Sequence, residues 1–452
     1  MKTTVWFAAM LLTVAFITID SEALEQAEPA LAALESRLTE SPGPANFVAY
    51  AYQANPSIRK ARESWRATVE KYRIATGLPD PQLMVTYFPE PIETRLGPQD
   101  WNAVLSQTIP FPGKLIKSGE LVEADAQMAK LKLDQAVRDV VVALRESYHE
   151  LAYIRKAREV ARQNSELLDH IRKVTETAYA GDRATLVDVV KAQSQVGQIR
   201  YDAILLDDLE QTEIARINGL LNRAPDAAVG SLQEIAIQPM AYTLDEIYRL
   251  AESAQEEIRI ADIQTQKAET RIDLARYEGY PDFKVGLFYA GIGQPDVPNR
   301  PSDSGDDAVG IQLGLSLPLW FGKNSGRIAS ARAEMREAEA ARQLRVTETR
   351  TQIRALFFRL ENARRIITLY QDDLLPQAAE SMELAETWFQ EGESGFTDFV
   401  EAQSVWYNFQ LALARSRADY GKFLARLERL VGRSLTEKTG TIEDPSVKEG
   451  EQ

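Results

Sequence analysis

The sequence predicts an α+β protein that contains two copies of one unit, each with a pair of β-strands and a long antiparallel helix hairpin. Three observations predict this class. Short motifs occur twice along the chain in the same order, which indicates internal duplication. Stretches in which apolar and polar residues alternate indicate strands, and very long stretches with an apolar residue every three or four positions indicate helices.

The duplication rests on four pairs of matching segments. Both copies have the same order of segments, and the spacing between partners grows slightly along the chain, as small loop insertions would produce. Four matches in the same order are not expected by chance. The pairs are residues 54–59 with 254–259, 78–80 with 280–282, 109–114 with 317–323, and 188–193 with 398–403.

Each copy carries two predicted strands. In residues 309–317, Val, Ile and Leu alternate with Gly, Gln and Ser, which gives one apolar face and one small or polar face. The other predicted strands are 82–88, 101–109 and 283–290. Residues 89–100 and 292–307 are rich in Pro and Gly, so they are predicted to be loops that join the strands of each pair.

Predicted helices precede and follow the strand pair along the sequence in both copies. Residues 57–77 and 258–279 each form a predicted helix that ends at a Gly shortly before a Pro. Residues 114–179 contain no proline and carry a continuous helical stripe. As one helix this stretch would span about 100 Å.

The long helical stripes are interrupted near their middles. Gly181 interrupts the first and Gly392 the second, so each stripe is predicted to fold into an antiparallel hairpin. Pro376 lies within the second hairpin only, and it is expected to kink that helix because it removes one backbone hydrogen bond.

These patterns divide the chain into five parts. Residues 1–23 have a basic start, a short apolar run and small residues near the end, which predicts a cleaved secretory signal peptide rather than a membrane anchor. Residues 24–222 are the first repeat and residues 244–432 the second. Residues 223–243 contain Pro and Gly and form the linker between them, and residues 433–452 are a polar tail.

The composition excludes several function classes. The chain has 52 basic and 67 acidic residues, for a net charge of −15, so it is a poor candidate for nucleic-acid binding. It has no cysteine, which excludes disulfides, thiolate metal sites and a cysteine nucleophile. The two histidines, His149 and His170, fall within a helical stripe, and no catalytic or zinc motif accompanies them. We therefore predict no enzyme activity, no cofactor and no bound metal.

Four strands in one chain are too few to close a membrane barrel, because the smallest such barrels use eight. If these are membrane strands, an oligomer is required. Two copies would supply eight strands and three copies would supply twelve. An apolar outer face with Gly, Ser and Gln on the inner face fits a water-filled lumen, although alternating strands are also found in ordinary sandwiches and barrels.

The combined motifs resemble the outer-membrane efflux protein family, the TolC family, over nearly the whole mature chain. The resemblance is carried by Asn55-Pro56, by Leu78-Pro79-Asp80-Pro81, and by residues 107–114 (Gln-Thr-Ile-Pro-Phe-Pro-Gly-Lys). It is also carried by the motif Asp-x-x-x-Ala-Gln, present at 188–193 and 398–403. The Pro-Phe-Pro-Gly-Lys passage is similar to the branch that serves heavy-metal pumps.

The resemblance implies an assembly and a location. A homotrimer would place twelve strands in one shared barrel in the outer membrane of a Gram-negative-type cell, in contact with outer-membrane lipid. Its long helix hairpins would form a periplasmic tunnel. The tunnel would dock on a periplasmic adaptor and an inner-membrane pump of the RND type. The implied function is the exit duct of a tripartite efflux system.

The resemblance also implies site residues at the helix turns. Gly181 and Gly392 correspond to tip glycines against which adaptor hairpins pack, and Phe389, at the second tip, is also assigned to adaptor contact. Glycine is also the usual helix terminator, and both roles can apply to the same residue.

Acidic residues near the second turn are expected to surround the tunnel entrance. Asp398 and Glu401 are three residues apart, so a helix places them on one face. Threefold symmetry would then gather six carboxylates into a cation filter. The commoner role of such a pair is a solvated helix face. In the first repeat Asp188 is kept, but Lys191 replaces the second acid.

Two other function classes are weighed against the duct. A periplasmic adaptor or coiled-coil scaffold would also carry long helix hairpins, but adaptors normally have one hairpin per chain. The sequence contains no catalytic motif that would support an exported hydrolase.

Overall fold

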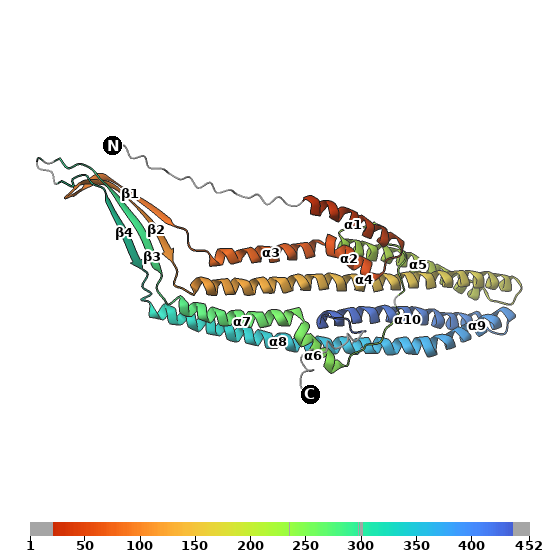
Figure 1. Cartoon of the computed structure of the whole chain (residues 1–452). Helices are drawn as coiled ribbons and strands as arrows, with labels where there is room; N and C mark the ends of the chain where they lie inside the picture. The colour runs from red at the N-terminus through yellow and green to blue at the C-terminus, as the bar shows by residue number, and fades with distance from the viewer. Residues whose placement is uncertain (1–20, 235, 297, 299–301, 437–452) are drawn as a thin grey trace, which may run out of the picture.

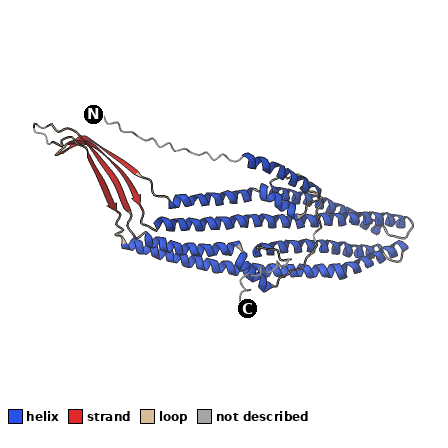
Figure 2. Ribbon diagram, in the orientation of Figure 1, coloured by secondary structure: helices blue, strands red, loops and turns tan. Residues whose placement is uncertain are grey.

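The computed structural model describes residues 21–234, 236–296, 298 and 302–436. The molecule is elongated, with a four-stranded sheet at one end and the turns of two long helix hairpins at the other (Figure 1). Helices account for everything between these ends apart from short loops and one linker (Figure 2). Most of the predicted signal peptide, residues 1–20, lies outside the described residues.

The two repeats have the same order of helices and strands. In each, short helices lead to a pair of strands and then to a hairpin. The first repeat contains α1 (Ser21–Glu40), α2 (Pro44–Ala54), α3 (Pro56–Thr76), β1 (Gln82–Thr94), β2 (Gly97–Ile109), α4 (Lys114–Ala180) and α5 (Leu186–Leu221). The second contains α6 (Leu244–Ala254), α7 (Glu256–Tyr277), β3 (Phe283–Ile292), β4 (Ala308–Leu315), α8 (Phe321–Thr368), the π-helix η1 (Leu369–Leu374), α9 (Leu375–Glu391) and α10 (Phe396–Val431). Helices α1, α2 and α6 were not among those the sequence predicted.

The first matching pair of segments is a buried helix start. Asn55 lies between α2 and α3, and its side chain accepts hydrogen bonds from the backbone N–H groups of Ser57 and Ile58. Gln255 occupies the equivalent place before α7 and accepts from Ile258. Both side chains are almost fully buried. Their hydrogen bonds satisfy backbone donors that would otherwise have no partner inside the core.

The sheet is antiparallel in the order β1-β2-β3-β4, and the second repeat therefore adds its strand pair directly to the first. Opposite residues form rows across all four strands. One row is Leu83, Leu105, Leu287 and Ile311, and all four side chains are exposed. The next row, on the other face, is Gln82, Ser106, Gly286 and Gln312. The first row is therefore apolar across all four strands, whereas the opposite face mixes this polar row with the apolar side chains of Met84, Val104 and Phe288.

The predicted loop at residues 89–100 is wrong in its extent. Strand β1 continues to Thr94, β2 begins at Gly97, and the turn between them is short. The pairing of β1 with β2 is interrupted between Tyr87 and Ile92, so Pro89 and Pro91 lie where no ladder hydrogen bond is required. Gly97 has a φ of +139°, which favours glycine at this turn.

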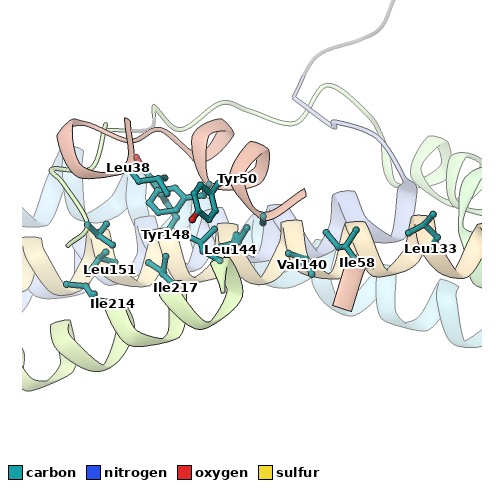
Figure 3. Packing of buried hydrophobic residues seen from close by; sticks show 14 residues of the cluster. Leu38, Tyr50, Ile58, Leu133, Val140, Leu144, Tyr148, Leu151, Ile214 and Ile217 are labelled. Atoms are coloured by element: carbon teal, nitrogen blue, oxygen red, sulfur yellow. The ribbon is translucent and has the colours of Figure 1, made fainter. Parts of the chain in front are cut away.

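The core lies midway along the hairpins, where α1 and α2 pack on α4 and α5. Tyr148 of α4 is at its centre and packs edge-on against Phe47, with ring centroids 5.9 Å apart. Figure 3 shows Leu38, Leu144, Leu151 and Ile217 around Tyr148. A second cluster joins α6 to α8 and α10, and it includes fully buried Leu435. Leu435 is thus part of the core rather than of the predicted polar tail.

The linker between the repeats crosses this region without forming a helix or strand in its described residues. Tyr148 of the first repeat donates a hydrogen bond to the carbonyl of Gln233 at 2.6 Å. Tyr420 of the second repeat donates to the carbonyl of Gln238, also at 2.6 Å. The linker is therefore attached to one helix of each hairpin.

The second hairpin is interrupted by a π-helix. Residues 369–374 form η1, and α9 follows with Pro376 in its first turn. Because proline has no backbone N–H, it cannot complete the α-helical hydrogen bond to the carbonyl four residues before it. At the place of the predicted kink the structure has a π-helical segment, which ends two residues before Pro376. Among the described residues, no helix has the length and apolar character needed to cross a membrane.

Candidate functional site

The two hairpin turns form the candidate site, at the end of the molecule opposite the sheet (Figure 1). At the second turn, Gly392 ends α9 with a φ of +82°, and its N–H donates to the carbonyl of Phe389 at 3.2 Å. The side chain of Asp398 accepts a hydrogen bond from the N–H of Gly395 at 3.3 Å. Asp398 therefore stabilises the start of α10 as well as carrying charge.

The first turn also ends one helix and caps the start of the next, but with different residues. Gly181 ends α4 with a φ of −100°, and the positive φ belongs to Asp182 instead. Thr185 caps the start of α5, and the side chain of Asp188 accepts hydrogen bonds from the Thr185 N–H at 3.0 Å and the Thr185 hydroxyl at 2.7 Å. These bonds, the hydroxyl bond first, hold the pKa of Asp188 below its usual range. The backbone therefore does not require glycine at position 181.

A hydrogen bond from a charged residue joins the two turns. Lys191 of α5 donates a hydrogen bond to the hydroxyl of Thr397 at 3.2 Å, beside Asp398. Glu401 and Asp398 are both exposed on α10. The structure thus brings the cation of the first repeat to Thr397, one residue before Asp398 in the second repeat.

Phe389 is buried, in contrast to its predicted place on a contact surface. Its side chain is 9% exposed and lies against Phe396 and Phe399, with ring centroids 5.8 Å and 6.1 Å away. Phe389 therefore holds the two arms of the hairpin together and offers little surface to a partner. Gly181 and Gly392 are exposed.

A groove between the turns was missed by the sequence interpretation. It has a volume of about 620 Å³ and lies between the start of α5 and the start of α10. Leu186, Val187 and Val190 line it, and more than half of each side chain is exposed. The signal was present in the sequence, because three large apolar residues at the start of a helix exceed what one buried face needs.

Neither histidine lies in a catalytic arrangement. His149 lies beside Arg145 and Lys422 in the body of the hairpins, and burial, followed by these two charges, lowers its pKa to about 4. His170 is exposed. In the described part of the chain, no three His, Asp or Glu side chains converge as metal ligands.

Comparison with known proteins identifies the relationship. Residues 247–433, which correspond to the second repeat, match the family model of outer membrane efflux proteins. The chain is thus related to the outer membrane efflux proteins. A curated relative is the pyoverdine export outer membrane protein OpmQ of Pseudomonas aeruginosa, 24% identical over 295 residues. The match covers 63% of this chain and 58% of OpmQ, so it spans less than two thirds of that relative's length.

Solved structures of similar fold cover nearly the whole chain. The outer membrane protein VceC of Vibrio cholerae superimposes with a TM-score of 0.71 at 19% identity, covering 87% of this chain and 96% of VceC. A membrane protein from Pseudomonas aeruginosa gives 0.75 at 16% identity, covering 90% and 94% of the two chains.

These findings confirm the predicted resemblance to outer membrane efflux proteins and the predicted α+β fold with its strand pairs and long helix hairpins. The solved structures show the fold, and the family model matches the second repeat alone. The roles assigned to the residues of the turns stay predictions.

Proposed function

We propose that this chain is the exit duct of a tripartite efflux system. In this proposal three copies assemble into a homotrimer whose strands form one barrel in the outer membrane. A periplasmic adaptor and an inner-membrane pump of the RND type deliver cargo to the hairpin turns. Residues 1–23 direct export, and residues 24–222 and 244–432 each contribute two strands and one hairpin.

The apolar face of the sheet is the observation that carries this proposal. On β4, Val309, Ile311 and Leu313 are each at least 75% exposed, although they are strongly apolar. In water such a surface would be a site of aggregation, whereas acyl chains would cover it. The other face of the sheet, with Gln82, Ser106 and Gln312, suits a water-filled lumen.

The unpaired edges of the sheet favour an oligomer. Within the described chain, β1 pairs only with β2, and β4 pairs only with β3, so each end strand has a free row of backbone groups. Lipid cannot satisfy these groups, which must therefore pair with another copy. Three copies would give twelve strands, as in the proposed barrel.

The alternatives fit the structure less well. A sheet with an apolar outer face is not expected in an adaptor or coiled-coil scaffold, because that face would be exposed to water. A duct needs no catalytic step, and neither histidine has a catalytic arrangement. The relative OpmQ is a pyoverdine export protein, so we propose exported small molecules as one cargo class, beside metal ions and drugs.

In this proposal Asp398, Glu401 and Asp188 surround the entrance, and the adaptor packs against the turns at Gly181 and Gly392. The exposed positions of Asp398 and Glu401 support the first point. The apolar groove beside Val187 supports the second, because an adaptor helix could bury it.

Conductance of the purified protein in planar bilayers tests the duct and its entrance together. The wild type should conduct and should prefer cations. The double variant Asp398→Asn with Glu401→Gln should lose most of that preference, and Lys191→Gln should increase it, because each change alters charge at the proposed entrance. The matched control is Glu63→Gln with Glu70→Gln on exposed α3, which should not change selectivity. Absence of any conductance would contradict the duct, and unchanged selectivity would contradict only the acidic entrance.

A further inference from the structure

We infer that neighbouring copies of this chain are joined by an ion pair between Lys323 of one copy and Asp80 of the next, at the end of the sheet that meets the helices. The inference rests on the proposed trimer, in which β4 of one copy pairs with β1 of another. It follows from the duplication, because the two repeats already form the equivalent contact with each other inside one chain.

Inside the chain, the segment between β2 and α4 holds the start of β3. Lys114 donates a hydrogen bond through Nζ to the carboxylate of Asp282 at 2.7 Å and another to the carbonyl of Tyr280 at 2.8 Å. The N–H of Phe111 donates to the same carboxylate at 2.8 Å. The ring of Phe111 stacks on that of Tyr280, with centroids 4.7 Å apart. One ion pair and one apolar pair therefore join the first repeat to the second.

The ion pair has an equivalent in the opposite combination of repeats. Lys323 follows β4 as Lys114 follows β2, and Asp80 precedes β1 as Asp282 precedes β3. The segment after β4 has one more residue than its match, and α8 begins two residues before its lysine. The flexible stem of a lysine side chain accommodates such a difference.

Lys323 and Asp80 are free within one chain. Both are exposed, and across the described residues neither side chain makes a hydrogen bond or an ion pair. The glycines that precede the two lysines show the same contrast between the repeats. A Cβ atom on Gly113 would lie 2.7 Å from the ring of Tyr277, whereas one on Gly322 would meet nothing within 4 Å. The surroundings that the first lysine finds inside the chain are thus open at the second.

The apolar pair is also unmatched. Leu319 is the counterpart of Phe111, and Leu78 is the counterpart of Tyr280. Phe111 and Tyr280 are stacked on each other, but Leu319 is 64% exposed and Leu78 is 57% exposed. A contact between Leu319 of one copy and Leu78 of the next would remove both side chains from water.

The order of the strands and helices brings these residues together between copies. Strands β1 and β4 are the outer strands of the sheet. The helices follow the same order, since α3 packs on α4, α4 on α7, and α7 on α8. A neighbour that pairs its β1 with β4 therefore brings its α3 beside α8, in the relation that α7 has to α4. The start of its β1, with Asp80, then lies beside Lys323.

The strand register agrees with this arrangement. Strands β2 and β3 pair Ile109 with Phe283. The same register between β4 and the β1 of a neighbour places Leu313 opposite Val85. Both side chains are more than 60% exposed and lie on the face of the sheet that carries the apolar row. A shift of one residue would turn one of them to the other face, so the transferred register keeps that face continuous between copies.

Cross-linking tests the contact directly, because the chain has no native cysteine. In outer-membrane vesicles, a short bismaleimide should link full-length chains that carry Lys323→Cys with Asp80→Cys to one another, up to a covalent trimer after denaturation. Lys114→Cys with Asp282→Cys is the positive control and should give links within one chain only. In the negative control Glu63→Cys replaces Asp80→Cys. Glu63 is exposed on α3, about 20 Å from the end of that helix, and should link at least about tenfold more slowly.

Charge reversal supplies the second measurement. Lys323→Asp alone, or Asp80→Lys alone, would place like charges together at each junction and should speed dissociation of the trimer on mild heating at least about fivefold. The two changes together restore opposite charges and should return the rate to within about twofold of the wild type. Lys132→Asp is the matched control, because Lys132 is exposed on α4 and has no ion pair in the described part of the chain. It should not change the rate.

The outcomes separate this contact from the proposed function. Native mass spectrometry of the same vesicles reports whether trimers are present. Trimers that link no faster through positions 323 and 80 than through the control positions would overturn the contact and leave the proposed duct standing. A doubly reversed variant that dissociates as fast as the single variants would also overturn the contact. If the wild type formed no oligomer, both the contact and the proposed trimer would be wrong.

Discussion

Two glutamines in the same repeated motif have opposite environments. Gln403 is 2% exposed and donates a hydrogen bond to the side chain of Asn164, which is equally buried. Gln193, at the equivalent position of the first repeat, is exposed. The duplicated motif therefore gives a capped helix start in both repeats, but in the second it also supplies a buried polar contact between α10 and α4.

Replacement of Gln403 should destabilise the protein, whereas the equivalent change in the first repeat should not. Gln403→Ala leaves the buried amide of Asn164 without its partner, which costs about 1–3 kcal/mol. Gln193→Ala should change the free energy of unfolding by less than about 0.5 kcal/mol. Urea unfolding followed by helical circular dichroism measures both. Equal effects of the two changes would contradict the contribution assigned to the Asn164 contact.

The buried imidazole of His149 should make stability depend on pH. Its pKa is about 4 in the folded chain, first because of burial and then because of Arg145 and Lys422, against a usual value of 6.5. Between these values the unfolded chain binds a proton that the folded chain does not. Stability should therefore be complete above pH 6.5 and should fall as pH drops toward 4, by at most about 3 kcal/mol.

His149→Gln should remove this part of the pH dependence, since an amide does not titrate in that range. The chain offers a matched control in its only other histidine, the exposed His170. His170→Gln should leave the profile of melting temperature against pH as it is in the wild type. If both variants gave the wild-type profile, protonation of His149 would not be the cause.

At the scale of secondary-structure elements, the π-helix η1 distinguishes the second hairpin from the first. Helix α4 runs without interruption from Lys114 to Ala180, whereas the equivalent helix is divided into α8, η1 and α9. Tyr370 in η1 packs edge-on against Phe409 of α10, with ring centroids 5.2 Å apart. The π-helix η1 therefore contributes to the packing between the two arms of the second hairpin.

Removal of the proline that follows η1 should stabilise the second hairpin. Pro376→Ala restores a backbone donor and relieves the clash of the ring with the preceding turn, which should raise the free energy of unfolding by about 1–3 kcal/mol. Pro44→Ala is the control, because Pro44 is the first residue of α2, where proline costs nothing. Thermal unfolding compares the two. If Pro44→Ala raised the free energy of unfolding and Pro376→Ala did not, Pro376 would not be the cause of the π-helical interruption.

The sequence predicts helices and strands where the pattern is local, and fails where partners are distant. The alternation in residues 309–317 was sufficient to locate β4, and the glycines at 181 and 392 located both hairpin turns. The extension of β1 through Pro89 and Pro91 could not be predicted, because proline is tolerated only where the partner strand leaves a gap. At the candidate site, the burial of Phe389 depends on α10 folding back against it, which the local sequence around Phe389 does not show.

At the scale of the whole molecule, the sheet and the hairpins have different relations to their surroundings. The hairpins bury apolar residues within the chain in clusters around Tyr148, Leu427 and Phe399, although other apolar residues, such as those of the groove at the turns, are exposed. The sheet instead exposes its apolar residues on one face and leaves two edges unpaired. The apolar face and the unpaired edges of the sheet are therefore features that the proposed duct would explain.

Adjacent positions of β4 should respond oppositely to the same charge. Ile311 belongs to the apolar row with Leu287, and Gln312 belongs to the polar row with Gly286. In the proposed barrel Ile311→Lys faces acyl chains and should destabilise the trimer by about 2–4 kcal/mol, whereas Gln312→Lys faces water in the lumen and should be tolerated. Native mass spectrometry of the outer-membrane fraction measures the yield of trimer for each variant. Because the two variants share one strand, one charge and nearly one depth, loss of trimer in both would point to strand pairing rather than lipid contact. Loss in neither would contradict the proposed membrane face.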